Sequence, residues 1–200
     1  MGLPKEIIFA TGNSGKVATL RKHLAIDGLE VAVVQQSLDL IEPQASTASE
    51  VAGVKARQAY DQIRKPVLVD DSSFHIAALG GFPGPYIKYM LETVGARGIV
   101  KFMEGQTDRR AYFMSSLVFV DENGKAHTFD GQDEAGTIVE VMDEYNHPDA
   151  WSELWKIFAP PGFNKTYSQM NEDEFLQHRL QKRENNAYKQ FSEWLKESRF

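Results

Sequence analysis

Short apolar runs separated by polar or glycine-containing turns predict the strands of a sheet in the first half of the chain. Glu6–Ala10 and Leu29–Val34 are the first two candidate strands. A third run, Pro66–Val69, contains no polar residue, which is typical of a strand that is buried on both faces. We therefore expect a sheet with at least one interior strand.

The second half of the chain adds longer strand patterns. Arg110–Val120 alternates and is rich in aromatic and β-branched residues. The turn sequence at 121–124, Asp-Glu-Asn-Gly, is typical of a hairpin, so this strand should pair with Ala126–Phe129. Gly131–Val141 predicts a further strand, whose two glycines, Gly131 and Gly136, mark bulges or points of close approach.

Apolar positions at helical spacing lie between these strands. They predict a helix from about Val17 to Ala25, and one or two short helices over Ile87–Met103, broken near 95–98. Thr47 and Glu50 have the spacing of a capping box, so Glu50 is expected to cap a helix rather than bind a ligand. The apolar face of that helix consists of Ala52, Ala56, Ala59 and Ile63.

The longest helical pattern extends from Asn171 to about Ser198, and Asn171 with Glu174 can cap its start. Its apolar stripe consists of Leu176, Leu180, Ala187, Phe191 and Trp194. Strands and helices alternate along the chain without an internal repeat or a linker. The pattern predicts one mixed α/β domain over residues 1–200.

Composition narrows the class of protein. Hydrophobic residues make up 42% of the chain and charged residues 25%, as in globular domains. The absence of cysteine excludes disulfides and thiolate metal sites. No apolar run approaches a membrane span and Met1–Glu6 lacks signal-peptide features, so we expect a cytoplasmic protein without a membrane partner. A net charge of −6 argues against a broad nucleic-acid surface.

Two acids follow the third candidate strand. Asp70 and Asp71 come directly after its apolar run, and a loop rich in glycine and proline occupies 80–85. Adjacent carboxylates at the end of a buried strand need a positive partner, and the carboxyl ends of strands are where ligands bind in open α/β sheets. From these residues alone, a metal or phosphate site and a solvated acidic turn are equally good interpretations.

A glycine-containing turn, Thr11–Lys16, follows the first strand and leads into a helix. Such a turn can bind an anion, because backbone N–H groups and the helix dipole both point at it. It is not a Walker A loop, since Ala10 stands where that motif needs glycine and Val17 where it needs Ser or Thr. A plain strand-to-helix turn is the alternative, and Lys55, beside the apolar face of its helix, is by itself more typical of a solvated lysine.

Together these segments resemble the inosine triphosphate pyrophosphatase family, the housecleaning enzymes for non-canonical purine nucleoside triphosphates. The first matching segments are Phe9–Asn13 with Lys16, Val67–Ser72 and Leu79–Lys88. The later ones, in the family's order, are Phe158–Gly162, Thr166-Tyr167 with Met170, and His178-Arg179. The run LGGFPGPYIK after an acid pair is highly specific, and the matches span nearly the whole chain.

The resemblance implies an elongated, mixed and twisted sheet with flanking helices and two lobes around a central cleft, usually in a homodimer. It implies a nucleoside triphosphate substrate and a Mg2+ cofactor. The residues carried over for the phosphates are Thr11, Gly12, Asn13, Lys16, Lys55, Ser72 and Lys88. Those carried over for magnesium are Glu42 and Asp71, a sufficient set because magnesium takes few carboxylates. His178 and Arg179 carry over as the residues that bind the base.

The implied reaction is attack of water on the α-phosphorus, which releases pyrophosphate and a nucleoside monophosphate. Asp70 or Asp71 would orient or deprotonate the water, and either could be the base while the other holds the ion. The metal and the lysines would neutralise charge on the leaving pyrophosphate.

Two departures from the family pattern concern the base. The family's aromatic-Gly-Trp-Asp element is replaced here by Trp151–Ile157. The family's lysine before its Ser-His-Arg is absent from Asn171–Leu176, and Gln177 replaces the serine. Two alternatives stay open: a pyrophosphatase for another nucleotide class, and a nucleotide-binding module without turnover. The retained acids and lysines favour the enzyme.

Overall fold

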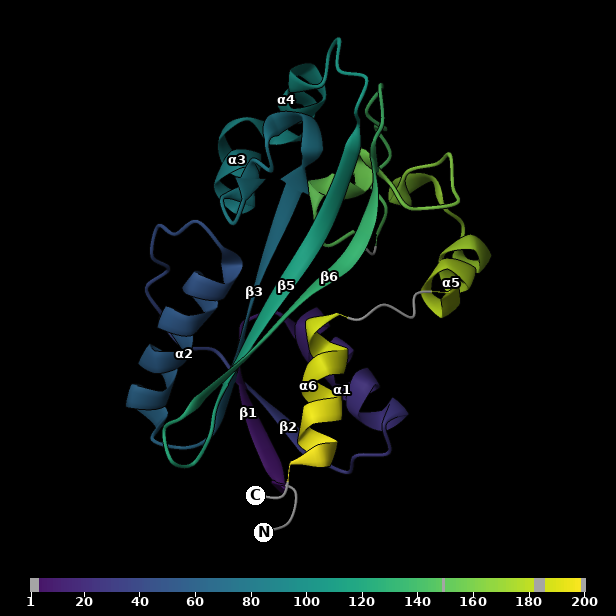
Figure 1. The fold of residues 1–200 in the computed structure, drawn as a ribbon. Coiled ribbons are helices and arrows are strands. Elements are labelled where there is room, and N and C mark those ends of the chain that lie inside the picture. Colours follow the sequence, from purple (N-terminus) through teal and green to yellow (C-terminus); the bar gives the residue numbers. More distant parts are fainter. Residues whose placement is uncertain (1–3, 149, 182–185, 199–200) are drawn as a thin grey trace. The chain divides into compact units, whose positions relative to one another are not determined.

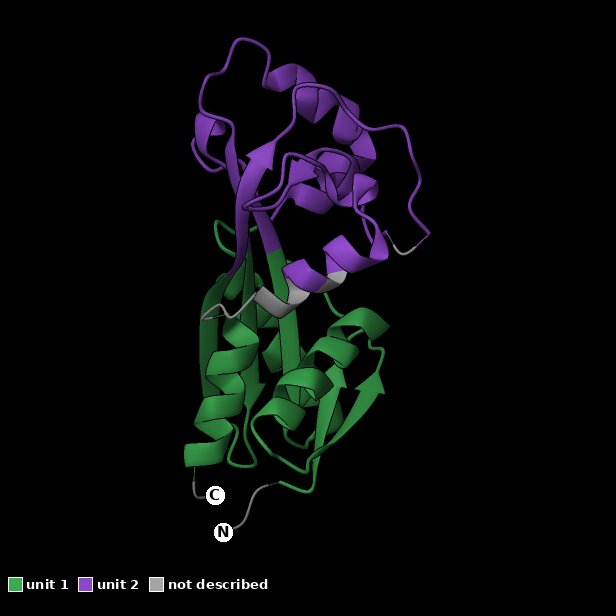
Figure 2. Ribbon diagram, turned by 90° about the vertical axis from the view of Figure 1, so that its right-hand side faces the viewer, with its two compact units in different colours: residues 1–72, 114–132, 185–200 green, residues 73–113, 133–184 purple. Residues whose placement is uncertain are grey.

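A computed structural model describes residues 4–148, 150–181 and 186–198 of the chain. It contains a seven-stranded mixed sheet in the order β2-β1-β3-β5-β6-β7, with β4 paired to β3 (Figure 1). The expected mixed α/β class is confirmed. The chain divides into two compact units, residues 1–72, 114–132 and 185–200 in the first and residues 73–113 and 133–184 in the second (Figure 2).

Parallel strands start the sheet in the first unit. β1 (Glu6–Ala10) has the predicted bounds and pairs in parallel with β2 (Ala32–Gln36) and with β3 (Val67–Ile76). β2 was expected at 29–34 but begins later, because its register pairs Glu6 with Ala32 and carries the ladder on to Gln36. The polar end of β2 was therefore missed.

Helices cover both faces of the sheet in this unit. α1 (Ser14–Ile26) and α6 (Ala187–Glu197) lie on one face and α2 (Ala48–Ile63) on the other (Figure 1). Side chains alternate along a strand, so neighbouring residues of one strand enter different cores. The core beside α1 and α6 includes Ile7, Phe9, Leu20, Leu68 and Phe191. The core beside α2 includes Ile8, Ala52, Ala56, Val67 and Val69.

The helix starts follow from side-chain caps. α1 begins at Ser14, earlier than predicted, because the Asn13 side chain accepts the backbone N–H groups of Gly15 and Lys16. The capping box of α2 is confirmed: Thr47 accepts the N–H of Glu50, whose carboxylate accepts the N–H of Thr47.

Short elements surround a separate core in the second unit. They are η1 (Ala77–Leu79), β4 (Pro83–Gly84), α3 (Ile87–Thr93), α4 (Gly95–Phe102), η2 (Glu153–Lys156), β7 (Phe158–Ala159), η3 (Tyr167–Gln169) and α5 (Glu172–Gln181). The predicted break between two short helices is confirmed at Gly95, whose φ of 70° interrupts the helix. The core includes Phe74, Ile76, Ile99, Ile157 and Phe158.

A hairpin contributes to both units. β5 (Arg110–Val120) has the predicted bounds, and the turn at 121–125 leads into β6 (Ala126–Ile138). Two separate strands were expected over 126–141, but β6 is continuous. Its glycines are points of close approach, as predicted: a Cβ on Gly131 would lie 2.4 Å from the Ala187 nitrogen, and one on Gly136 would lie 2.4 Å from the Ala159 oxygen.

The prediction of a single C-terminal helix that starts at Asn171 is wrong. The structure has two helices, α5 and α6, and α6 starts with a cap of its own, in which Asn186 accepts the N–H of Lys189 at 2.9 Å. The cap that Asn171 and Glu174 provide at the start of α5 is confirmed. The side chains of Leu176 and Leu180 lie outside the described part of the structure. Within the described residues, no helix is both long and apolar enough to cross a membrane.

Candidate active site

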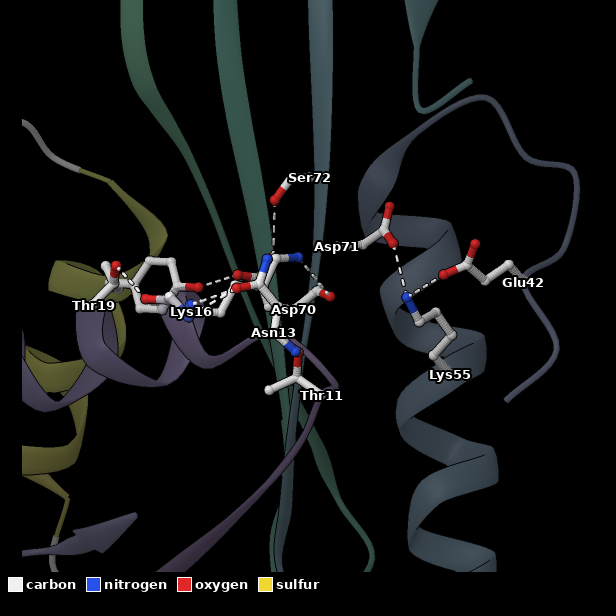
Figure 3. Close-up of polar contacts among 11 residues, drawn as sticks. Thr11, Asn13, Lys16, Thr19, Glu42, Lys55, Asp70, Asp71 and Ser72 are labelled. Atoms are coloured by element: carbon white, nitrogen blue, oxygen red, sulfur yellow. Dashed lines mark hydrogen bonds and ion pairs between the residues drawn. The ribbon is translucent and has the colours of Figure 1, made fainter. Parts of the chain in front are cut away.

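The acid pair lies inside β3, so the prediction that the strand stops before Asp70 is wrong. Pairing with β1 ends at Leu68, opposite Phe9, and β3 then continues past the carboxyl end of β1 to Ile76. Because successive side chains of a strand point to opposite faces, Asp70 points to one face of the sheet and Asp71 to the other. Figure 3 shows the two carboxylates on opposite sides of the strand.

Asp70 lies on the α1 and α6 face, where donors from three elements hold its carboxylate. Lys16 of α1 places its Nζ 3.1 Å from Oδ1, and the Ser72 hydroxyl donates to the same oxygen at 3.3 Å. The Tyr188 hydroxyl of α6 donates to Oδ2. The Asp70 side chain is only 1% exposed, so these donors stabilise a carboxylate that water hardly reaches.

Asp71 lies on the α2 face and shares a lysine with Glu42. The Lys55 ammonium of α2 is 3.0 Å from Asp71 Oδ1 and 2.8 Å from Glu42 Oε1 (Figure 3). Burial raises the pKa of the Asp71 carboxyl, and the attraction of Lys55 offsets this only in part. Burial opposes the charge on Lys55, but the two carboxylates outweigh it and raise the pKa of that amine. Three predicted site residues thus form one cluster.

The turn Thr11–Lys16 connects β1 to α1 and is held by its own hydrogen bonds. Asn13 Oδ1 accepts the N–H of Gly15 at 2.8 Å and that of Lys16 at 3.3 Å, while the Asn13 N–H donates to Thr11 Oγ1 at 3.1 Å. The Thr11 N–H donates to the carbonyl of Gln36, at the end of β2. Asn13 therefore acts as the cap of α1, and phosphate binding by Thr11, Gly12 and Asn13 stays a prediction.

The residues on the α2 face fit a magnesium ion. Glu42 and Asp71 already meet one cation, the Lys55 ammonium, so both carboxylates reach a common position. Magnesium is bound by few carboxylates and keeps water and phosphate oxygens as its other ligands. The parts of the chain that the structure describes hold no cluster of three or more His, Asp or Glu residues that could ligate a metal. A site with two carboxylates matches that chemistry.

The remaining predicted site residues belong to the second unit. Lys88 is exposed in the first turn of α3. His178 is buried on α5, where its Nε2 lies 2.5 Å from Glu134 Oε1 and 3.2 Å from the Tyr167 hydroxyl. Arg179 follows it on α5, and its side chain lies outside the described part of the structure.

Comparison with known proteins identifies the family. The sequence matches the family model of the Ham1 family over residues 7–194. This chain belongs to the Ham1 family. It is 34% identical over 193 residues to the dITP/XTP pyrophosphatase of Methanopyrus kandleri, covering 96% of either chain. It is 31% identical over 177 residues to the inosine triphosphate pyrophosphatase of Kluyveromyces lactis, covering 86% of this chain and 88% of that one.

A solved structure agrees with this assignment. A HAM1 protein from Coxiella burnetii superposes with a TM-score of 0.77 at 28% identity, covering 96% of this chain and 99% of that chain. The resemblance inferred from the sequence motifs is therefore confirmed at the level of the family and of the fold.

Sequence reasoning missed two polar residues of this Ham1-family chain, Tyr188 and Glu134, and named Tyr167 only as part of a matching segment, without a role. A buried tyrosine needs a partner for its hydroxyl, so Tyr188 within an apolar stripe was a usable signal. That signal could not name Asp70 as the partner, because 117 residues separate the two in sequence. Glu134 gave no signal, since an acid within an alternating strand normally faces solvent.

Proposed function

We propose that this chain is a Mg2+-dependent pyrophosphatase that converts non-canonical purine nucleoside triphosphates into nucleoside monophosphates and pyrophosphate. The main observation that supports this proposal is that β3 presents a carboxylate on each face of the sheet. Asp70 is paired with Lys16, and Asp71 is paired with Lys55. A binding module needs no such arrangement of acids for metal and water. The names of relatives, dITP/XTP pyrophosphatase and inosine triphosphate pyrophosphatase, support the choice of substrate.

Lysines would bind the triphosphate. Lys16 and Lys55 now contact carboxylates, and Lys88 is exposed. An ammonium group is a point charge on a flexible stem, so it can exchange a carboxylate for a phosphate oxygen without a fixed geometry. We assign the outer phosphates to these lysines, together with Thr11, Gly12, Asn13 and Ser72.

Glu42 and Asp71 would hold the magnesium ion. When bound, the ion would neutralise charge on the phosphate oxygens, the main source of catalysis in phosphoryl transfer. Without it, Lys55 supplies the positive charge between the two acids. Lys55 therefore keeps the two carboxylates together until a cation and a triphosphate arrive.

We assign the proton of the attacking water to Asp71. The water oxygen forms a bond to the α-phosphorus, the bond from that phosphorus to the bridging oxygen breaks, and pyrophosphate leaves. The oxygens of Asp70 already accept bonds from Lys16, Ser72 and Tyr188, which reduces their capacity to take up another proton. Asp70 then orients Lys16.

A panel of triphosphates with magnesium tests the proposal, with pyrophosphate and orthophosphate release measured separately. We expect pyrophosphate from inosine and xanthosine triphosphates and little from ATP, because donor groups of His178 and Arg179 would meet the amino group of adenine. Selection against GTP should be weak, since the Gly-Trp-Asp element is missing. Release of orthophosphate, or tight binding without turnover, would refute the proposal.

Assembly and location extend the proposal. We infer a homodimer, which the family resemblance implies, and we propose that it works in the cytoplasm, where a housecleaning enzyme would meet the nucleotide pool. Size-exclusion chromatography with light scattering decides the first point: a mass close to that of one 22.6 kDa chain would contradict a dimer.

A further inference from the structure

Helix α6 reaches the candidate active site through the side chain of Tyr188. This residue is 5% exposed, and its hydroxyl donates to Oδ2 of Asp70. The other carboxylate oxygen, Oδ1, accepts from Lys16 Nζ at 3.1 Å and from the Ser72 hydroxyl at 3.3 Å. The two oxygens of one buried carboxylate therefore contact different elements, α6 at Oδ2 and α1 with β3 at Oδ1.

A close approach between α6 and β6 sets the position of Tyr188. A Cβ on Gly131 of β6 would lie 2.4 Å from the Ala187 nitrogen, so any larger residue at 131 would push the start of α6 away. Ala187 is fully buried there, and Asn186 caps the helix by accepting the N–H of Lys189 at 2.9 Å. Tyr188 follows Ala187 directly, so its backbone is fixed against the sheet independently of what its hydroxyl contacts.

The ring of Tyr188 packs against α1. It stacks on the imidazole of His23, with ring centroids 6.0 Å apart and an interplanar angle of 21°. His23 and Lys16 lie on the same face of α1, since positions i and i+7 of a helix lie above one another. Helix α1 thus contacts the ring of Tyr188 through His23 and, through Lys16, the carboxylate that the tyrosine hydroxyl holds.

The hydrogen bond at Oδ2 limits where the Lys16 ammonium can bind. An ammonium on a flexible stem can contact either oxygen of a carboxylate. Because the Tyr188 hydroxyl occupies Oδ2, the ammonium is directed to Oδ1, and it lies 3.4 Å from the backbone oxygen of Asp70 as well. The Lys16 side chain is 26% exposed and that of Asp70 1%. The ammonium therefore lies between a buried acid and the solvent.

We propose that Tyr188 is a positioning residue for Lys16. By holding Oδ2 of Asp70, it fixes the carboxylate so that Oδ1 presents the ammonium to the outer phosphates of the substrate. The inference rests on the proposed function, because it takes Lys16 to bind those phosphates. Tyr188 itself does not touch the substrate, and its effect on binding passes through Asp70 and Lys16.

A double-mutant cycle tests this route. Tyr188→Phe keeps the ring and removes the donor, and we expect it to weaken triphosphate binding roughly three- to tenfold and monophosphate binding much less. In a Lys16→Ala background the same substitution should change triphosphate affinity by less than about twofold. Unchanged affinity in the parent background, or an equal loss in both backgrounds, would overturn the proposal.

The probe for the cycle is an inosine triphosphate analogue with a methylene group between the α- and β-phosphorus atoms. It cannot release pyrophosphate, so calorimetry with magnesium measures binding without turnover, and inosine monophosphate is the second ligand. If the parent chain binds the analogue but releases no pyrophosphate from inosine triphosphate, the proposed function is wrong and the cycle still tests the inference. A parent chain that does not bind the analogue would overturn the inference.

Ser192→Ala is the matched control on the same helix. Ser192 is fully buried one turn after Tyr188, and its hydroxyl donates to Asp27 at the end of α1. Its loss removes a buried hydrogen bond between α6 and α1 without touching Asp70, so we expect lower stability in urea unfolding and unchanged triphosphate affinity. If Ser192→Ala weakens triphosphate binding as much as Tyr188→Phe does, loosening of α6 explains both effects and the proposal is overturned.

The position of Lys16 can also be followed without a nucleotide. Carbon-13 NMR resolves the Cε groups of lysines, and Lys16→Ala identifies the Lys16 signal by its loss. We expect Tyr188→Phe to shift this signal and Ser192→Ala to leave it unchanged. An unchanged Lys16 signal in Tyr188→Phe would show that the tyrosine hydroxyl does not position the ammonium, and would overturn the proposal.

Discussion

Asp70 and Asp71 are neighbours in sequence, yet their surroundings differ in almost every respect. Asp70 is enclosed beside α1 and α6, and its donors come from α1, β3 and α6. Asp71 faces α2 and shares Lys55 with Glu42, whose side chain is 54% exposed. The cause is the pleat of β3, which sends adjacent side chains to opposite faces of the sheet.

The two acids therefore differ in how they are held. Several donors hold the Asp70 carboxylate in place, whereas Asp71 shares one lysine with Glu42 and can exchange that lysine for a metal ion. The contacts of Asp70 come from α1, β3 and α6 and hold its carboxylate in one place. The partner of Asp71 is an ammonium that also binds a loop residue, so the cluster can open when a metal ion replaces it. A single strand thus supplies an orienting carboxylate and a reactive one, and each can be tested separately.

The largest effect should come from Asp71→Asn. The amide keeps the shape but removes the charge that holds magnesium and accepts the proton, so we expect kcat to fall by about 10²–10³-fold. The measurement is pyrophosphate release at saturating magnesium. Asp108→Asn is the control, because it also removes a carboxylate, one paired with Arg110 on the surface. If the Asp71→Asn variant is nearly as active as the parent chain, Asp71 takes no part in the reaction.

A smaller effect is expected from Lys16→Ala. Lys16 is assigned to the outer phosphates, so its loss should weaken triphosphate binding roughly 10- to 100-fold and monophosphate binding much less. Calorimetry with both ligands measures the ratio. Lys88→Ala should behave alike. An equal loss for both ligands would place either lysine away from the outer phosphates.

Tyr188→Phe tests how much the stability of the fold depends on the hydrogen bond from α6 to Asp70. Removing the hydroxyl leaves an oxygen of the buried Asp70 without its donor, which should cost about 1–2 kcal/mol of unfolding free energy. Urea unfolding measures it. Tyr60→Phe is the control, since its hydroxyl contacts the carbonyl of Glu122 near the surface. If Tyr188→Phe is as stable as Tyr60→Phe, Asp70 does not depend on α6.

The smallest effect concerns Lys55→Met and magnesium. In the parent chain the ammonium already satisfies Glu42 and Asp71, so adding magnesium alone should change Tm little. Without the ammonium the acids need a cation, and a tenfold gain in affinity would add about 1.4 kcal/mol at saturating magnesium. Thermal melts with magnesium and with a chelator measure the difference. Equal shifts in both proteins would show that Lys55 does not occupy the cation position.

Local sequence patterns predicted most of the helices and strands. β1 and β5 have their predicted bounds, and the capping box at Thr47 is present, because each depends on residues adjacent in sequence. β2 was misplaced because its ends depend on pairing with β1 rather than on its own pattern. The C-terminal helix was merged because a helical period does not reveal that Asn186 caps a new helix.

The candidate site was predictable as a set of residues but not as an arrangement. The sequence motifs identified Asp70, Asp71, Lys16 and Lys55 as site residues. The structure pairs each acid with one of the lysines. Which acid contacts which lysine depends on β3 continuing through Asp70 and Asp71. The sequence does not predict this continuation, because polar residues normally mark the end of a buried strand.

The alternation along β3 also constrains how this chain can change over evolutionary time. Loops tolerate insertions and deletions, but one residue gained or lost between Leu68 and Asp70 would exchange the faces of the two acids. Asp70 would then point toward α2 and Asp71 toward Tyr188, with every motif still present in the sequence. A change of two residues would restore the faces but displace both acids along the strand. The spacing within this strand should therefore be inherited as strictly as the acids themselves.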